Sequence, residues 1–137
     1  MSTAIKIQTT VSKDPQTTWD CYTLPEHIVN WNFASEDWHC PEAENEMTVG
    51  GKYRARMEAK DGSFGFDFEG VYQHIKPGES FGYQLEDGRN IEVIFKPQGD
   101  STEVTVTFDA DEQNPIDMQR NGWQAILDNF QKYTEQA

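Results

Sequence analysis

The chain has few cysteines and few basic side chains, and it has no long apolar run. Two cysteines, Cys21 and Cys40, are too few for the disulfide framework of a small secreted domain. We therefore expect reduced thiols and a cytoplasmic location. No stretch approaches the ~20 apolar residues of a membrane-spanning helix, and the N-terminus lacks the apolar centre of a secretion signal. The sequence predicts no membrane insertion.

Positive charge is also scarce. Eleven Lys and Arg residues stand against twenty-four Asp and Glu residues, which gives a net charge of −13. Nucleic-acid binding depends on cationic side chains that neutralise phosphates, so we expect no nucleic-acid partner. An anionic membrane surface is disfavoured for the same reason.

The middle of the sequence alternates apolar and polar residues from Gly51 to Phe108. Short turn sequences interrupt the alternation at 60–63, 76–79, 86–89 and 99–101. Asp-Gly and Pro-Gly, which occur in these turns, suit tight hairpins. The pattern predicts a meander of five antiparallel strands with one buried face. We expect these strands at Lys52–Ala59, Phe64–Ile75, Ser80–Glu86, Asn90–Lys96 and Glu103–Ala110.

Further elements flank the meander. A strand is predicted at 4–11, and Asp14-Pro15 is typical of a helix start. The capping-box spacing of Thr23 and Glu26 favours a second short helix at 24–30, and a weak strand is expected at 42–47. Asn114-Pro115 starts a long helix to about residue 134, with apolar side chains at spacings of three and four. The prediction is one α+β domain over residues 1–137, with its helices on one face of the sheet.

Aromatic side chains, with Phe64 and Phe66 among them, dominate the predicted buried inner face of the meander. Three of them, Tyr53, Tyr72 and Tyr83, carry hydroxyl groups that need hydrogen-bond partners when buried. Two interpretations stay open at this point. The aromatic rings either fill the interior to normal density, or the sheet curls away from the long helix and leaves an apolar pocket with a few polar groups.

Two segments carry a family resemblance: Val49–Tyr72, which contains VGGKYRARMEAKDGSFGFDFEGVY, and Asn114–Phe130, which contains NPIDMQRNGWQAILDNF. The chain resembles the bacterial family named for homology to the C-terminal domain of the heat-shock-protein-90 (Hsp90) ATPase activator. That family is part of the SRPBCC group, with START lipid-transfer domains, the birch-pollen allergen and polyketide cyclases. The resemblance implies a helix-grip fold, in which a curved antiparallel sheet grips a long C-terminal helix around an apolar cavity. Some relatives bind lipid-like or polyphenolic molecules.

The resemblance and the aromatic inner face together favour a binding protein over an enzyme. We expect a small, mostly apolar ligand, lipid-like or polyphenolic, in an internal cavity, and a monomer or weak dimer. A co-chaperone-type interaction module with a chaperone partner is one alternative. A cyclase-like or dehydratase-like enzyme is another, and it would need an acid–base pair inside the cavity. The predicted cavity lining is Tyr53, Met57, Phe66, Phe68, Tyr72, Tyr83, Val93, Phe95 and Trp123, with Arg120 nearby to hold a ligand carboxylate.

The sequence predicts no cofactor, no catalytic residues and no metal. Cys21, His27, His39 and Cys40 lack the paired short spacing of zinc ligands. Trp123 is expected to face the sheet, either as an ordinary core residue or as part of a cavity wall, and the two roles are compatible. Trp19, Trp31 and Trp38 are expected to pack as structural residues.

Overall fold

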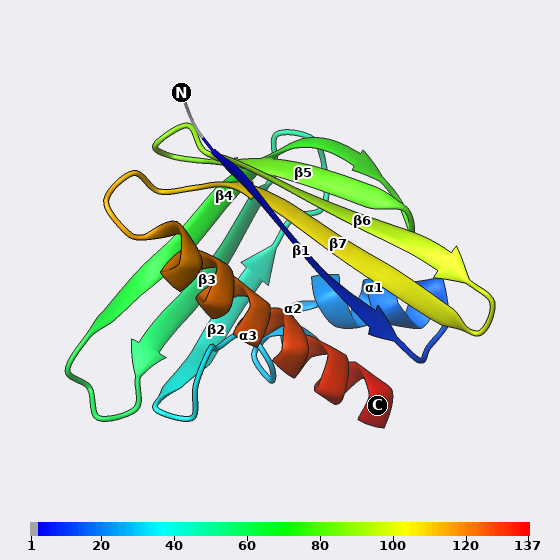
Figure 1. The fold of residues 1–137 in the computed structure, drawn as a ribbon, viewed down its shortest axis with the longest axis horizontal. Coiled ribbons are helices and arrows are strands. Elements are labelled where there is room, and N and C mark those ends of the chain that lie inside the picture. Colours follow the sequence, from blue (N-terminus) through cyan, green and yellow to red (C-terminus); the bar gives the residue numbers. More distant parts are fainter. Residues whose placement is uncertain (1–2) are drawn as a thin grey trace.

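The computed structural model describes residues 3–137 and shows one curved sheet with three helices on the same side (Figure 1). The sheet order is β1-β7-β6-β5-β4-β3-β2, and every neighbouring pair is antiparallel. The elements in chain order are β1 (Ala4–Val11), α1 (Pro15–Thr23), α2 (Pro25–Ile28), β2 (Trp38–Asn45), β3 (Lys52–Ala59), β4 (Gly65–Lys76), β5 (Ser80–Leu85), β6 (Asn90–Gln98), β7 (Ser101–Asp109) and α3 (Ile116–Gln136). The predicted α+β class and element order are confirmed.

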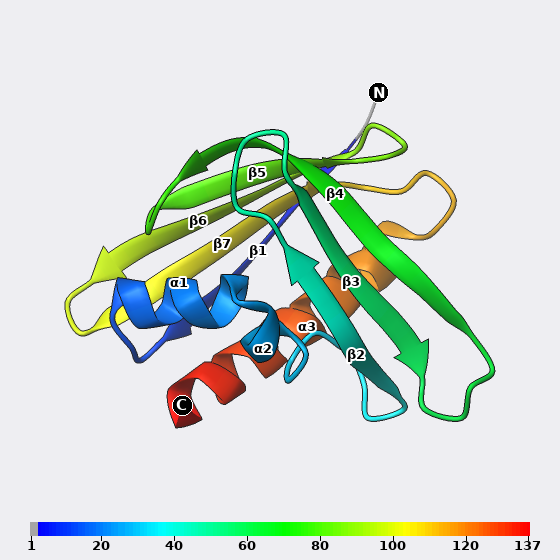
Figure 2. The same ribbon diagram turned by 180° about the vertical axis from the view of Figure 1, so that it is seen from behind.

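The long helix α3 crosses the concave face of the sheet (Figures 1 and 2). It packs closely against β1 at one edge of the sheet and against α1, while α1 also contacts β6 and β7. The strands toward the opposite edge, β4, β3 and β2, make far fewer contacts with the helix. The sheet and α3 are therefore close at one side and apart at the other.

The predicted hairpin turns are present. Gly62 and Gly88 have φ angles of +78° and +94°, the left-handed region that an Asp-Gly turn requires and that glycine adopts without steric cost. The strand predicted at 42–47 begins earlier, at Trp38. A register shift lies between His39 and Glu42, around Pro41. Proline interrupts the regular ladder and the alternation, which is why the first half of β2 was not evident in the sequence.

Two of the predicted helix starts need correction. Asp14 caps α1 as expected, since its carboxylate accepts the backbone N–H of Thr17 at 3.1 Å. Thr23 does not cap α2; its hydroxyl donates to the Trp19 carbonyl at 2.8 Å, and Leu24 occupies the cap position. At α3 the cap position is Pro115, and the Asn114 side chain donates to Asp111 instead. No helix within residues 3–137 has both the length and the apolar character needed to cross a membrane.

The alternation assigned the inner face correctly along most of the meander, but not at one end. The inward residues of β3, β5, β6 and β7 are buried, with Val93, Val104 and Phe108 at 1% exposure or less. Phe64 and Phe66 were predicted to be buried and are instead 60% and 41% exposed. The β3–β4 hairpin extends beyond α3 at this end (Figure 1), and the two rings pack on Trp38 of β2, with centroids 6.0 Å and 6.1 Å away.

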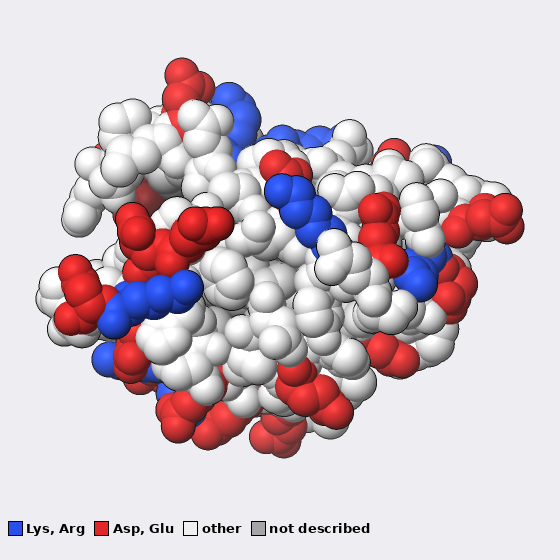
Figure 3. Space-filling view, turned by 90° about the horizontal axis from the view of Figure 1, so that it is seen from below, with Lys and Arg blue, Asp and Glu red and all other residues white. Residues whose placement is uncertain are grey.

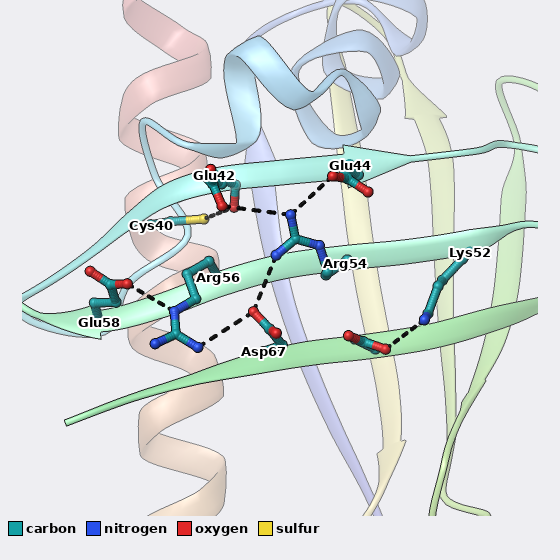
Figure 4. Close-up of polar contacts among 9 residues, drawn as sticks. Cys40, Glu42, Glu44, Lys52, Arg54, Arg56, Glu58 and Asp67 are labelled. Atoms are coloured by element: carbon teal, nitrogen blue, oxygen red, sulfur yellow. Dashed lines mark hydrogen bonds and ion pairs between the residues drawn. The ribbon is translucent and has the colours of Figure 1, made fainter.

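Ion pairs cover the outer face of β2, β3 and β4 (Figure 4). The Arg54 guanidinium lies 3.0 Å from the Glu44 carboxylate on β2 and 3.2 Å from Asp67 on β4. Arg56 contacts Glu58 at 2.8 Å and Asp67 at 3.6 Å. These contacts join three neighbouring strands. They also neutralise two of the chain's eleven cationic side chains.

Acidic side chains are spread over the face seen from below, and Lys and Arg side chains interrupt them in only a few places (Figure 3). With a net charge of −13, the molecule carries a predominantly negative field. Such a field slows the approach of anionic molecules and favours neutral or cationic ones.

Candidate functional site

A cavity of about 290 Å³ lies between the sheet and α3. Nine of its seventeen lining residues are aromatic and five are aliphatic or Met, so its wall is mainly apolar. The lining consists of Ile7, Tyr22, Trp31, Asn32, Asn45, Tyr53, Met57, Phe66, Phe68, Tyr72, Phe81, Tyr83, Arg89, Val106, Trp123, Ile126 and Leu127. An apolar wall with a few polar groups is typical of small-molecule sites.

Trp123 holds the cavity open at the helix side. Its indole stacks on Phe108 of β7, with ring centroids 4.1 Å apart, and meets the edge of Phe68 on β4 at 5.8 Å. The large ring therefore spans from the closely packed side of the sheet to the side that curves away. The helix is kept at a distance from β4, and the space left between them is the cavity.

Gly70 on β4 makes room for one wall of the cavity. A Cβ atom added at this position would lie 2.4 Å from Cδ2 of Tyr83, much closer than real Cβ contacts. The Tyr83 ring therefore lies directly over the Gly70 backbone. This contact keeps the ring against the sheet and out of the cavity space.

Two of the lining tyrosines are held by asparagines. The Tyr53 hydroxyl accepts a hydrogen bond from the Asn32 amide at 3.2 Å. The Tyr72 hydroxyl donates to the Asn45 side-chain oxygen at 2.5 Å, and the Asn45 amide donates to the Thr23 carbonyl at 2.6 Å. Asn45 thus connects the end of α1 to β4. These bonds fix the two phenols in place.

The other two lining tyrosines, Tyr22 and Tyr83, have hydroxyls without a hydrogen-bond partner among residues 3–137. A water-sized molecule can reach both hydroxyls. Within the described residues, only Thr134 Oγ1 is fully buried and lacks a hydrogen-bond partner. Both tyrosines line the cavity. Burial raises the pKa of Tyr22 and of Tyr83 well above the usual value, so both phenols stay neutral at physiological pH.

Arg89 is the one charged residue of the lining as the structure describes it. Its guanidinium lies 2.8 Å from the Asp87 carboxylate, which neutralises it. A groove next to the cavity shares Arg89 and is otherwise lined by Asp87, Gly88, Asp109, Ala110, Asp111, Glu112 and Gln113. The groove lining holds four carboxylates and this one cation, so the local charge here is negative.

Seven of the predicted lining residues lie on the cavity wall: Tyr53, Met57, Phe66, Phe68, Tyr72, Tyr83 and Trp123. Val93 and Phe95 lie elsewhere, because α1 covers β6 and the Phe95 ring packs on Trp19 at 5.2 Å. Arg120 is exposed on α3 and contacts Asp117 at 3.4 Å, so it does not reach the cavity. The cationic residue beside the cavity is Arg89 instead.

Sequence reasoning missed the two asparagines and Arg89. Asn32 lies in the irregular segment before β2, Asn45 lies at the end of a strand that the sequence indicated only weakly, and Arg89 lies in a turn sequence that indicated only a hairpin. Trp31 was expected to be structural, and it does donate its indole N–H to the Cys21 carbonyl at 2.9 Å while also lining the cavity. Its position ten residues after Cys21 gave no sign of this contact.

Within residues 3–137, no three His, Cys, Asp or Glu side chains come together as a metal site. Both cysteines are buried and unpaired. Burial raises the pKa of Cys40 to about 11, so its thiol stays protonated, and it donates to the Glu42 carbonyl at 3.4 Å.

Comparisons with known proteins agree with this geometry. The family model described as "Activator of Hsp90 ATPase homolog 1-like protein" matches residues 13–135. The chain belongs to this family. Among solved structures, the AHSA1-like protein from Aeromonas hydrophila is 36% identical, with a TM-score of 0.92 over 98% of this chain and 93% of that one. Chr148 from Cytophaga hutchinsonii is 41% identical, with a TM-score of 0.84 over 96% and 92% of the two chains.

More distant structures share the fold alone. CV1439 from Chromobacterium violaceum has a TM-score of 0.85 at 20% identity and covers 96% of each chain. The comparison with curated proteins gives no match. The predicted family and helix-grip fold are thus confirmed for this AHSA1-like chain.

Proposed function

We propose that the protein binds a small, mostly apolar molecule in the cavity between its sheet and α3. The observation that supports this most directly is the cavity itself, about 290 Å³ in volume and lined mainly by aromatic rings. Packed protein cores leave few voids larger than a water molecule. An engineered apolar cavity of ~150 Å³ binds benzene, so a space of this size suits a molecule of two or three rings.

Native mass spectrometry of gently purified protein tests the proposal. We expect a retained molecule, or a mass increase when a two-ring aromatic compound is added. Isothermal titration calorimetry with the same compound should show saturable binding at one site. If no lipid-like or aromatic compound of this size binds, the proposal fails.

A co-chaperone-type interaction is the second candidate, and the family match is the observation that favours it. It predicts that adding the protein changes the ATPase rate of an Hsp90 chaperone. NMR chemical shifts would then move on the outer surface of the protein rather than at the cavity-lining residues. No change in the ATPase rate would remove this candidate.

An enzyme that uses the same cavity would have to rely on tyrosines. Apart from Arg89, the titratable side chains of the described lining are four tyrosines with raised pKa values. A neutral phenol can donate a hydrogen bond, but it is a poor general base at physiological pH. The lining therefore supports binding better than acid–base catalysis. The cytoplasmic location and the monomeric or weakly dimeric state stay predictions.

A further inference from the structure

We infer that the cavity selects neutral aromatic molecules that carry a hydroxyl or carbonyl oxygen, and that the hydroxyls of Tyr22 and Tyr83 bind this oxygen. The inference rests on the proposed function and specifies the chemical class of the ligand. Three features of the cavity support it. Within the part of the chain that the structure describes, only two of its four phenols have hydrogen-bond partners, the rings of the other two are held rigidly, and the charge at its edge is negative.

The first feature is that only two of the four tyrosine hydroxyls in the cavity wall have a hydrogen-bond partner in the described chain. Tyr53 and Tyr72 are each held by an asparagine, whereas Tyr22 and Tyr83 have no partner within residues 3–137. A hydrogen bond that replaces one made to water contributes about 0.5–1.5 kcal/mol. A ligand oxygen that accepts from these two hydroxyls would gain this contribution. The same ring system without an oxygen would not.

The four phenols also lie close together. The ring centroids of Tyr53 and Tyr83 are 5.5 Å apart, and those of Tyr72 and Tyr83 are 6.0 Å apart. Tyr22 and Tyr83 both pack against the Phe81 ring, with centroids 5.8 Å and 6.2 Å from it. The two unpartnered hydroxyls therefore belong to one polar spot in an otherwise apolar space. One oxygen-bearing end of a ligand can meet them while its rings contact the aromatic wall.

The second feature is the rigidity of this polar spot. Tyr83 lies over Gly70, and its ring stacks on Phe81 with planes 20° from parallel. Tyr22 is packed edge-on against Phe130, with ring centroids 4.9 Å apart. Neither ring can turn freely to find another partner. The hydroxyls are therefore already in position for a ligand, which lowers the entropy cost of binding.

The third feature is charge, and it argues against an anionic ligand. A fatty acid or an aromatic acid needs a cation to bind its carboxylate, but Arg89 already forms an ion pair with Asp87 through its Nε atom. The adjoining groove adds Asp109, Asp111 and Glu112. A carboxylate that entered the cavity would lose its hydration and meet this negative field. We therefore expect the cavity to discriminate against carboxylates.

Three probes with the same two rings test the inference: naphthalene, 2-naphthol and 2-naphthoate. Isothermal titration calorimetry near neutral pH should show that 2-naphthol binds about 3- to 10-fold more tightly than naphthalene, the effect of about one good hydrogen bond. The anion 2-naphthoate should bind at least about 10-fold more weakly than 2-naphthol. These comparisons use the wild-type protein.

A double variant, Tyr22→Phe with Tyr83→Phe, keeps both rings and removes both hydroxyls. It should bring the affinity for 2-naphthol down to that for naphthalene and leave naphthalene binding unchanged. Tyr133→Phe is the matched control, because the Tyr133 hydroxyl contacts His27 at 2.6 Å outside the cavity lining. It should leave the ratio of the two affinities as in the wild type.

The outcomes distinguish a failure of the proposed function from a failure of the role assigned to the two hydroxyls. If none of the three probes binds, the cavity itself is not a binding site and the proposed function fails. If naphthalene binds as tightly as 2-naphthol, the role of the two hydroxyls is overturned while the cavity stands. If 2-naphthoate binds best, the charge argument is overturned and Arg89 must be free to bind an anion.

Discussion

The indole of Trp123 stacks on the ring of Phe108, with centroids 4.1 Å apart and planes 14° from parallel. Trp123 comes from α3 and Phe108 from β7, so this pair joins the helix to the sheet. Phe108 is 1% exposed, but Trp123 is only partly buried because part of its indole borders the cavity. The pair thus marks the boundary between the packed core and the open space.

Replacing Trp123 by Ala should lower the free energy of unfolding by about 2–3 kcal/mol, less than the ~3–5 kcal/mol of a fully packed aromatic ring. The reason is that the indole loses contacts on its packed side only. Phe130→Ala is the comparison, since Phe130 is fully buried and should reach the higher range. Urea unfolding followed by circular dichroism measures both. Equal losses would mean that Trp123 does not border a void.

Gly70→Ala should destabilise the protein by about 1–3 kcal/mol, the usual cost of overpacking. The new methyl group would push the Tyr83 ring off the sheet and into the cavity, so 2-naphthol affinity should fall as well. Gly122→Ala is the control within α3, where an added Cβ meets open space. It should stabilise the helix by about 0.5–1 kcal/mol. If Gly70→Ala is neutral, the close contact with Tyr83 is not as described.

Asn45→Ala should lower the free energy of unfolding by about 1–3 kcal/mol, because it leaves the Tyr72 hydroxyl and the Thr23 carbonyl without partners. Asn30→Ala removes an amide on the surface, where water can replace it, and should change stability by less than about 0.5 kcal/mol. Thermal or urea unfolding of the two variants checks the difference. Similar values for both would show that the Asn45 bridge contributes little.

Stability should fall as the pH rises above about 10, the pKa of a tyrosine in the unfolded chain. Burial raises the pKa of Tyr22, Tyr53, Tyr72 and Tyr83 in the folded protein. Below that pH the phenols are protonated in both states and the pH has no effect through them. Above it, only the unfolded chain loses these protons, which favours unfolding until the higher folded pKa values are reached.

The melting temperature between about pH 9 and about pH 11 measures this effect. Tyr83→Phe removes one of the four groups, so its melting temperature should decline less steeply than that of the wild type. Absorbance at the phenolate band should stay low until unfolding begins. A gradual rise of this absorbance in the folded protein would contradict the prediction.

The repeated alternation made the meander predictable, because each strand has one buried face and each turn contains a glycine-bearing sequence. The same rule failed at Phe64 and Phe66, since alternation reports which side of a strand faces inward but not whether a helix covers it there. The size of the cavity could not be predicted from the sequence either. It depends on how far Trp123 holds α3 from β4, a distance that no local pattern encodes.

The polar part of the site was predicted less well for a related reason. Tyrosines on an alternating strand can be assigned to a face, so Tyr53, Tyr72 and Tyr83 were found. Asn32 and Asn45 depend on the path of an irregular segment, and their partners are 21 and 27 residues away in sequence. Such contacts follow from the tertiary fold alone.

The outer edge of the sheet, β2, has a consequence for self-association. An edge strand normally presents free backbone groups to which a strand of another molecule can add. Here Pro41 has no amide hydrogen to donate, the register shift next to it disturbs the ladder, and the charged groups of Glu42 and Glu44, paired with Arg54, lie on the same strand. These features oppose the joining of two sheets edge to edge and the growth of fibrils. Any dimer would then have to form through side chains on another surface.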